Sequence, residues 1–210
     1  TLKGVGMTPE GIENNPVMYE LVMELPWRPD RFTKEEWLKE YVKARYGVDD
    51  PVVQAAWTNL ANSIYNSPKN LTQQGTHESV FCARPAEDVY QVSSWSEMKD
   101  YYRPQEVIEA ARLILARGQV DGGLAVADHF EGNNNFEYDL VDIVRQALAE
   151  KGRLMQKAVT AAYRAGDKQL FALASGKFLD LILLQDKLLG TRPEFRVGKW
   201  IEEARALGDT

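Results

Sequence analysis

The chain has 210 residues, and its 44% hydrophobic content and mean hydropathy of −0.40 are typical of a globular protein with a core. Its 31 acidic and 25 basic residues are interspersed and give a formal net charge of −6, so nucleic acid is not an expected partner. The longest apolar stretch, around Leu179–Leu184, is interrupted by Asp180 and is far shorter than the roughly 20 residues of a membrane span. A membrane is therefore not an expected partner either.

The cysteine and histidine content excludes two further classes of site. Cys82 is the only cysteine, which excludes a disulfide within the chain, and its apolar surroundings VFCARP predict a small buried side chain. The two histidines, His77 and His129, are about 50 residues apart and form no cluster with metal-ligand spacing. No metal site is expected.

The N-terminal residues predict a strand, a loop and a helix. Residues 2–7 alternate between apolar and small or polar types, as a short strand would, and the turn MTPEGI follows. Asn15 can cap the next helix with Pro16 at its first position, and Pro26 ends it. The opening in mid-strand is typical of an excised piece of a longer protein.

Helices dominate the rest of the chain, and we place a domain boundary near Arg28–Phe32. Thr33 and Glu36 form a capping box ahead of an apolar stripe that ends near Gly47. Helical periodicity recurs in five later segments, and the helix over 167–189 is more apolar than the one before it and should be more buried. The expected helices after the capping box begin at Pro51 and cover 104–117, 136–165, 167–189 and 196–207.

A long connection, Asn66–Arg103, separates two of these helices and is far longer than the usual four to six or so residues. Long ordered loops are often functional. Trp95 lies in it and could line a cleft or pack the loop down. The other tryptophans fall on helical stripes and are expected in the core: Trp27, Trp37, Trp57 and Trp200.

Glu10 is the acidic residue with the most distinctive context. It follows the predicted strand and is flanked by Thr8, Pro9 and Gly11, which would hold its carboxylate in place. In a (β/α)8 barrel, the loops after the strands converge on the active site, and Glu10 would lie in such a loop. The alternative is a glutamate in an N-terminal loop without a role.

The stretch around Glu10 resembles the second catalytic segment of glycoside hydrolase family 89, the α-N-acetylglucosaminidases. The resemblance continues in order through RYGV (45–48), the Arg84-Pro85 pair, FEYDLVDIVRQA (136–147) and GKWIEEARAL (198–207), and so covers essentially the whole chain. The residues that match the family motif near Glu10 are Gly6, Met7, Pro9, Glu10, Gly11, Ile12, Asn15, Tyr19, Leu21, Glu24, Trp27 and Arg28.

The resemblance implies a mainly α fold: an all-α domain over residues 29–210, preceded by a strand-loop-helix remnant of a (β/α)8 barrel over residues 1–28. It implies an exo-acting hydrolase that releases terminal α-linked N-acetylglucosamine from glycans with retention, with Glu10 as nucleophile and His77 as a sugar contact. No cofactor is implied. The family's general acid lies on an earlier barrel strand, so the remainder of the barrel is an expected partner and this chain alone should be inactive.

The resemblance also implies a periplasmic or secreted location in bacteria and a lysosomal one in animals. A competing interpretation is a non-catalytic helical interaction or structural module, in which the N-terminal stretch is only a tail and Glu10 has no chemical task. An Asn-Glu pair on an earlier barrel strand of the same reading frame would favour the enzyme.

Overall fold

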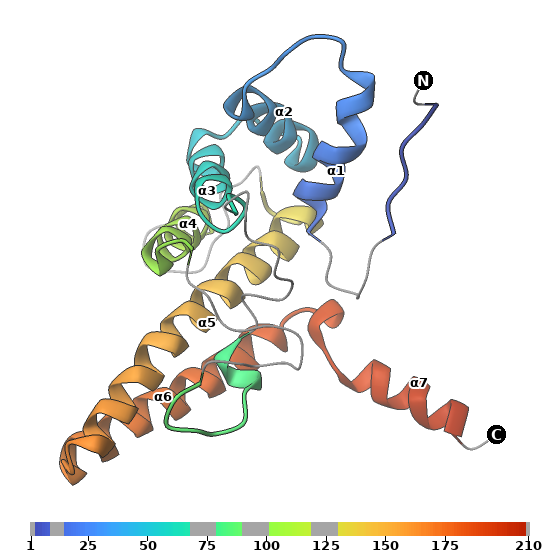
Figure 1. Cartoon of the computed structure of the whole chain (residues 1–210). Helices are drawn as coiled ribbons and strands as arrows, with labels where there is room; N and C mark the ends of the chain where they lie inside the picture. Colours follow the sequence, from blue (N-terminus) through green and yellow to red (C-terminus); the bar gives the residue numbers. More distant parts are fainter. Residues whose placement is uncertain (1–2, 9–14, 68–78, 90–100, 119–129, 209–210) are drawn as a thin grey trace. The chain divides into compact units, whose positions relative to one another are not determined.

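The computed structural model describes residues 3–8, 15–67, 79–89, 101–118 and 130–208. The chain divides into two compact units, Thr1–Asp50 and Pro51–Thr210, which are described separately below. The mainly α fold expected from the sequence is confirmed, because every regular element of the described residues is helical (Figure 1). None of the helices in this part of the chain combines the length and the apolar character needed to cross a bilayer.

The first unit contains α1 (Pro16–Glu24), the 3-10 turn η1 (Leu25–Trp27) and α2 (Lys34–Tyr46). The predicted capping box is present: the Thr33 hydroxyl accepts a hydrogen bond from the Glu36 amide, and the Glu36 carboxylate accepts one from the Thr33 amide. The Glu36 carboxylate also accepts a hydrogen bond from the Thr33 hydroxyl at 2.9 Å, and the bonds from the Thr33 amide and hydroxyl lower the pKa of Glu36. The helix ends as expected at Gly47, whose φ of +78° lies in the left-handed region that favours glycine.

The core of the first unit is aromatic. The Trp37 and Tyr41 rings stack with their centroids 5.2 Å apart, and both side chains are buried. The remaining buried hydrophobic residues of this unit are Val17, Leu38, Val42 and Tyr46. The apolar stripe predicted for α2 is thereby confirmed.

The predicted strand over residues 2–7 is not among the observed elements, because residues 3–8 have no regular secondary structure. A strand is defined by hydrogen bonds to a neighbouring strand. Residues 3–8 have no such neighbour within the described residues. The barrel remnant thus stays a prediction.

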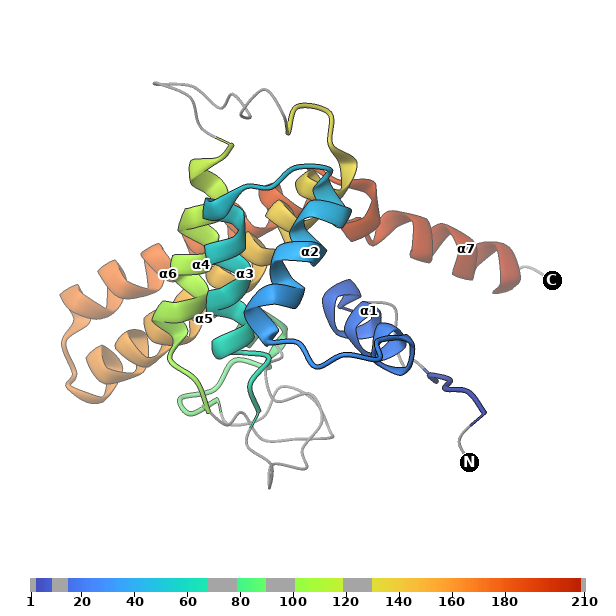
Figure 2. The same ribbon diagram turned by 90° about the horizontal axis from the view of Figure 1, so that it is seen from above.

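The second unit is built on four helices that pack in chain order, α3 on α4, α4 on α5 and α5 on α6 (Figure 2). Their bounds are Pro51–Asn62, Pro104–Ala116, Asn134–Arg164 and Lys168–Leu189. Two 3-10 turns, η2 (Val80–Cys82) and η3 (Pro193–Phe195), and the last helix α7 (Gly198–Gly208) complete the unit. All four helices and α7 agree with the periodicity of the sequence to within a few residues.

Apolar side chains from α3, α4 and α5 form the core of the second unit. Phe130 and Phe136 are fully buried and stack with their centroids 4.1 Å apart. Val53, Trp57, Val107 and Ile114 extend this core along α3 and α4. The buried face of α4 consists of Val107, Ala110, Ala111 and Ile114.

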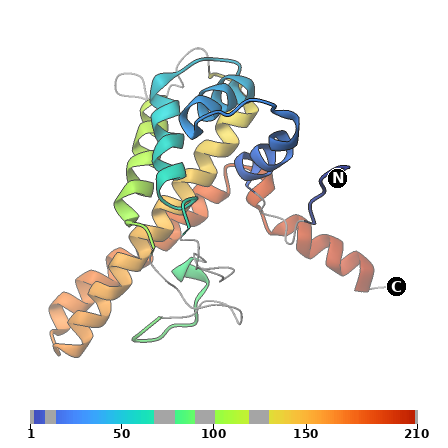
Figure 3. The ribbon, with the colours of Figure 1, turned by 45° about the horizontal axis from the view of Figure 1, so that its top comes forward.

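The helices α5 and α6 form a long antiparallel hairpin (Figure 3). Gly166, with φ of +67°, lies at the turn, and the Asp167 side chain caps α6 by accepting a hydrogen bond from the Leu170 amide at 2.9 Å. The expectation that α6 is the more buried helix is wrong. Gln185 is its only buried residue, and Leu179 and Leu183 are 59% and 60% exposed.

Two other burial predictions are also wrong in part. Trp37 and Trp57 lie in the core as expected, but Trp27 and Trp200 are 79% and 46% exposed. Cys82 is exposed rather than buried, because the short η2 turn directs Val80 inward instead. Apolar periodicity identifies a face, but burial also requires an element that covers it. Trp95 and His129 lie outside the described residues.

Candidate functional site

Both residues proposed from the sequence for chemistry, Glu10 and His77, lie outside the described residues. Glu10 belongs to the first unit and His77 to the second. The structure therefore describes neither side chain. It does describe the element that follows each of them in the chain. These elements are α1 after Glu10 and residues 79–89 after His77.

In the first unit, Glu24 at the end of α1 connects the helix to its surroundings. Its Oε2 atom accepts a hydrogen bond from Trp37 Nε1 at 2.9 Å and another from Arg28 Nε at 3.0 Å. Arg28 also reaches Glu40 on α2, with its Nη2 atom 2.5 Å from the carboxylate. The hydrogen bond to Glu40, with that to Glu24, raises the pKa of Arg28 and keeps the guanidinium charged.

These contacts fix the segment that the sequence places directly after the loop of Glu10. Trp37 is buried, so the bond from its indole to Glu24 fixes the end of α1 against α2. Arg45 adds an ion pair to Glu20 on α1 at 3.9 Å. The family motif residues Glu24 and Arg28 therefore have a structural role here, as ties between α1 and α2.

In the second unit, residues 79–89, hereafter the docked segment, lie against the α5–α6 hairpin. The segment begins with η2, where the Ser79 hydroxyl accepts a hydrogen bond from the Phe81 amide at 3.2 Å. Phe81 lies between the two helices, with its ring centroid 5.8 Å from that of Phe178 on α6. Val80 is buried beside it.

Four residues of α5, each four positions after the last, face the docked segment: Gly152, Gln156, Thr160 and Arg164. We call them the α5 row, since residues four apart on a helix form one ridge. At Gly152 a Cβ atom would lie 2.6 Å from Cε1 and Cζ of Phe81, closer than side chains tolerate. The glycine that interrupts the long amphipathic helix is therefore the place where Phe81 contacts the helix backbone.

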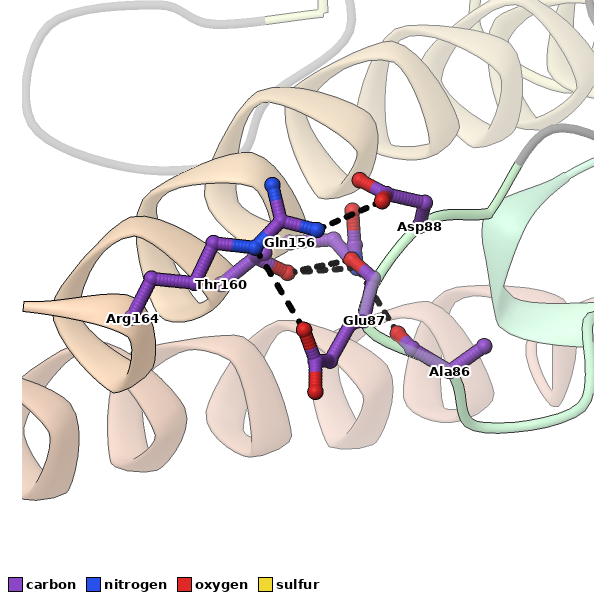
Figure 4. A network of polar contacts seen from close by, with 6 residues as sticks. All are labelled: Ala86, Glu87, Asp88, Gln156, Thr160 and Arg164. Carbon is purple, nitrogen blue, oxygen red and sulfur yellow. Dashed lines mark hydrogen bonds and ion pairs between the residues drawn. The ribbon is translucent and has the colours of Figure 1, made fainter.

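The other three residues of the row hold the docked segment through polar contacts (Figure 4). Gln156 Nε2 donates to the carbonyl oxygens of Ala86 and Glu87 at 3.2 and 3.1 Å, and Thr160 Oγ1 donates to the Glu87 carbonyl at 2.6 Å. Arg164 forms ion pairs with the side chains of Glu87 and Asp88 at 3.4 and 2.5 Å. Hydrogen bonds to Asp88 above all raise the pKa of Arg164.

A groove of about 440 Å³ lies between the docked segment and the hairpin. Side chains of both helices line it, including Val159, Phe171, Phe178 and Ile182, and Arg84 contributes a cation from the segment. Among the described residues, no three His, Cys, Asp or Glu side chains gather in a way that could hold a metal ion. The lining of the groove is thus mainly apolar, with two charged residues of the docked segment, Arg84 and Glu87.

A second buried polar cluster lies deeper, around Glu150, which is only 1% exposed. Glu150 accepts hydrogen bonds from the Tyr102 hydroxyl and from Gln146 Nε2, the latter at 3.0 Å, and pairs with Arg153 at 3.0 Å. Burial raises the pKa of Glu150, although the bonds from Tyr102 and Gln146 oppose that shift, and burial lowers the pKa of Arg153. The cluster ties Tyr102 to α5.

Sequence reasoning did not identify the α5 row or Glu150. Each is part of a helix that the apolar period predicts, but this period does not reveal polar contacts, and polar residues on such a helix are ordinarily solvated. Two signals could have found the row: Gly152 within an otherwise regular helix, and the four-residue spacing of Gln156, Thr160 and Arg164. Neither signal says what lies opposite.

Comparison with known families classifies this arrangement as the helical part of a glycosidase. Residues 37–210 match the family model of the alpha-N-acetylglucosaminidase (NAGLU) C-terminal domain, and residues 1–29 match the model of the tim-barrel domain of the same family. The chain belongs to the alpha-N-acetylglucosaminidase family. The resemblance found in the sequence is thereby confirmed.

Individual relatives agree with this assignment. The chain is 33% identical over 208 residues to alpha-N-acetylglucosaminidase of Homo sapiens, covering 98% of this chain and 26% of that protein. A family 89 glycoside hydrolase from Clostridium perfringens, solved with 2-acetamido-1,2-dideoxynojirmycin, is 34% identical with a TM-score of 0.85, covering 97% of this chain and 22% of that one. The chain thus spans about a quarter of the length of these relatives.

A second structure of the Clostridium perfringens protein contains its substrate, GlcNAc-alpha-1,4-galactose, and carries two glutamate-to-glutamine substitutions. It is 34% identical to this chain with a TM-score of 0.81, and the match covers 91% of this chain and 20% of that one. These relatives are hydrolases that act on α-linked N-acetylglucosamine.

Proposed function

We propose that this chain is the nucleophile-bearing and helical part of an exo-acting retaining glycoside hydrolase that releases terminal α-linked N-acetylglucosamine from glycans. The observation that carries the proposal is the order of the two family matches. Residues 1–29 match the end of a catalytic barrel and residues 37–210 match the helical domain that follows it. The proposed division of the chain is a barrel segment over residues 1–28 and a helical domain over residues 29–210.

Glu10 is the proposed nucleophile. In a retaining glycosidase one carboxylate attacks the anomeric carbon and forms a covalent glycosyl ester, while a second carboxylic acid protonates the leaving oxygen and then activates water. The motif Gly6–Ile12 around Glu10 supports this role, since its glycine, proline and threonine would hold the carboxylate. A substrate complex of a relative that lacks two glutamates is in keeping with a mechanism that needs two carboxyl groups.

His77 is the proposed contribution of the helical domain to substrate binding. It precedes Arg84-Pro85 in the sequence, in the order found in the family, and an imidazole can hydrogen-bond a sugar hydroxyl. The proposed partner of the chain is the remainder of the barrel, which supplies the general acid. The chain alone, with one of the two carboxyl groups, should then show little or no turnover.

The test compares the complete protein that contains this chain with its Glu10→Gln variant, using an aryl α-N-acetylglucosaminide as substrate. Glutamine keeps the shape of the side chain but cannot attack the anomeric carbon. We expect hydrolysis to fall by several orders of magnitude, with the melting temperature unchanged. The 210-residue chain assayed alone should show no turnover above background.

Glu13→Gln is the matched control, because Glu13 lies in the same turn and is not placed in the chemistry. It should keep activity close to the starting protein. Retained hydrolysis in Glu10→Gln would refute the assignment of the nucleophile. An inactive complete protein whose fold is intact would instead support the competing interpretation, a helical interaction or structural module.

A further inference from the structure

We propose that the α5 row, Gly152, Gln156, Thr160 and Arg164, is a positioning device that fixes the docked segment and, through it, the sugar-binding contribution of His77. The inference rests on the proposed function, because it gives the docked segment a task in that reaction. His77 lies two residues before Ser79, the first residue of the docked segment. Contacts that fix the docked segment therefore also fix the point from which the chain leads back to His77.

The two central residues of the row contact the backbone of the docked segment. Gln156 and Thr160 donate to the main-chain carbonyls of Ala86 and Glu87, so these hydrogen bonds do not depend on the side chains at those two positions. Gln156 Nε2 and Thr160 Oγ1 are also 3.1 Å apart and form a hydrogen bond with each other. The two donors are thereby oriented before the segment binds them.

The two ends of the row hold the two ends of the segment by different means. At one end Phe81 packs directly on the backbone of α5, which only a glycine at position 152 allows. At the other end Arg164 forms ion pairs with Glu87 and Asp88. An irregular segment held at both ends over three helical turns has few alternative positions.

Polar contacts hold most of the docked segment, and such contacts specify a geometry more than they stabilise a fold. Cys82 and residues 84–88 are exposed, so the segment contributes little apolar burial beyond Val80 and Phe81. Its polar contacts to α5 each contribute only modestly to folding in water. They do specify one geometry, and a displacement of about 1 Å near a reacting sugar can cost up to about a hundredfold in rate.

The experiment uses the complete protein with the double substitution Gln156→Met and Thr160→Val, which removes both donors and keeps the side-chain volumes. Hydrogen exchange of the peptides covering residues 79–89, read by mass spectrometry, should become faster. The value of kcat/KM for an aryl α-N-acetylglucosaminide should fall roughly ten- to a hundredfold. Thr160→Ser, which restores the hydroxyl, should recover most of the activity lost in Thr160→Val.

A double-mutant cycle with His77→Ala separates positioning from general weakening of the fold. If the row acts through His77, the double substitution should cause little further loss once His77 is alanine. Lys157→Gln is the matched control, because Lys157 lies between row residues on α5 and is exposed, and it should change neither exchange nor kcat/KM. A melting temperature close to that of the starting protein excludes unfolding as the cause.

Three results would overturn the inference. Unchanged exchange in residues 79–89 would mean that the row does not hold the segment. Faster exchange with undiminished kcat/KM, or losses that simply add to that of His77→Ala, would mean that the held segment does not position the sugar contact. Failure of the proposed function looks different, because the unmodified protein would then be inactive, and the exchange measurement would still decide whether the row holds the segment.

Discussion

The helices α5 and α6 pack against each other, yet they differ in hydrophobicity and in burial in opposite directions. The more apolar of the two, α6, has one buried residue, Gln185, whereas α5 buries residues along its length and includes three charged ones among them. The buried charged residues of α5 are Asp139, Glu150 and Arg153. Hydrophobic content therefore does not rank the two helices by burial.

The difference follows from how many elements cover each helix. Within the described residues, α5 packs on α4, η2 and α6, while α6 packs extensively on α5 alone. A helix covered on several sides can bury a charge, provided the charge is paired and hydrogen-bonded, as Glu150 is by Tyr102 and Arg153. The leucines of α6 stay exposed because no described element lies over them.

The largest expected effect on stability concerns α5, the helix that other elements cover. Phe136→Ala on α5 removes a fully buried ring that stacks on Phe130, so it leaves a cavity as well as losing apolar burial. We expect the free energy of unfolding to fall by about 3–5 kcal/mol. Urea denaturation of the 210-residue chain, followed by circular dichroism, measures this change.

Phe136→Leu is the control for this prediction, since leucine keeps most of the apolar volume and loses the stacking. It should destabilise the chain clearly less than alanine does. Equal losses of unfolding free energy in the two variants would show that the Phe136 ring is not enclosed. The contrast in burial between α5 and α6 would then not hold at this position.

The next effect concerns the buried charge of α5 and its dependence on pH. Because burial raises the pKa of Glu150 above its ordinary value of 4.5, the folded chain binds this proton more tightly than the unfolded chain. The stability contributed by the protonated carboxyl is thus lost as pH rises through the window above about 4.5. Glu150→Gln has no such proton, so its stability relative to the unmodified chain should improve between pH 4.5 and pH 7.5.

Urea midpoints at several pH values in that window provide the measurement. Glu131→Gln is the matched control, because it makes the same replacement at an exposed glutamate outside the Glu150 cluster. A Glu150→Gln deficit that grows toward neutral pH would mean that the ion pair with Arg153 outweighs burial and that the direction of the pKa shift is reversed.

Local patterns in the sequence predicted most of the helices because their causes are local. The capping box of Thr33 and Glu36 and the left-handed Gly47 mark the two ends of α2, and both are present. The apolar period predicted a helix over 136–165, where α5 covers Asn134–Arg164. Each of these features depends on residues within one or two helical turns.

Burial and the candidate site depend on residues far apart in the chain, and here the sequence was less informative. Gly152 is explained only by Phe81, and the exposure of Trp27 only by the absence of a described element over it. The polar residues of the α5 row have the spacing of a solvated helix face until the docked segment is placed against them. For Glu10 and His77 the sequence remains the source of their proposed roles, since both lie outside the described residues.

The smallest expected effect on stability concerns the exposed leucines of α6. Leu179 and Leu183 on α6 are 59% and 60% exposed, so replacing both by glutamine removes little buried apolar surface. We expect the free energy of unfolding to change by less than about 1 kcal/mol, against several for Phe136→Ala. The same urea titration measures it, with Lys177→Gln on α6 as a polar control. A loss as large as that of Phe136→Ala would mean that another part of the chain covers these leucines in solution, and α6 would then be a core helix like α5.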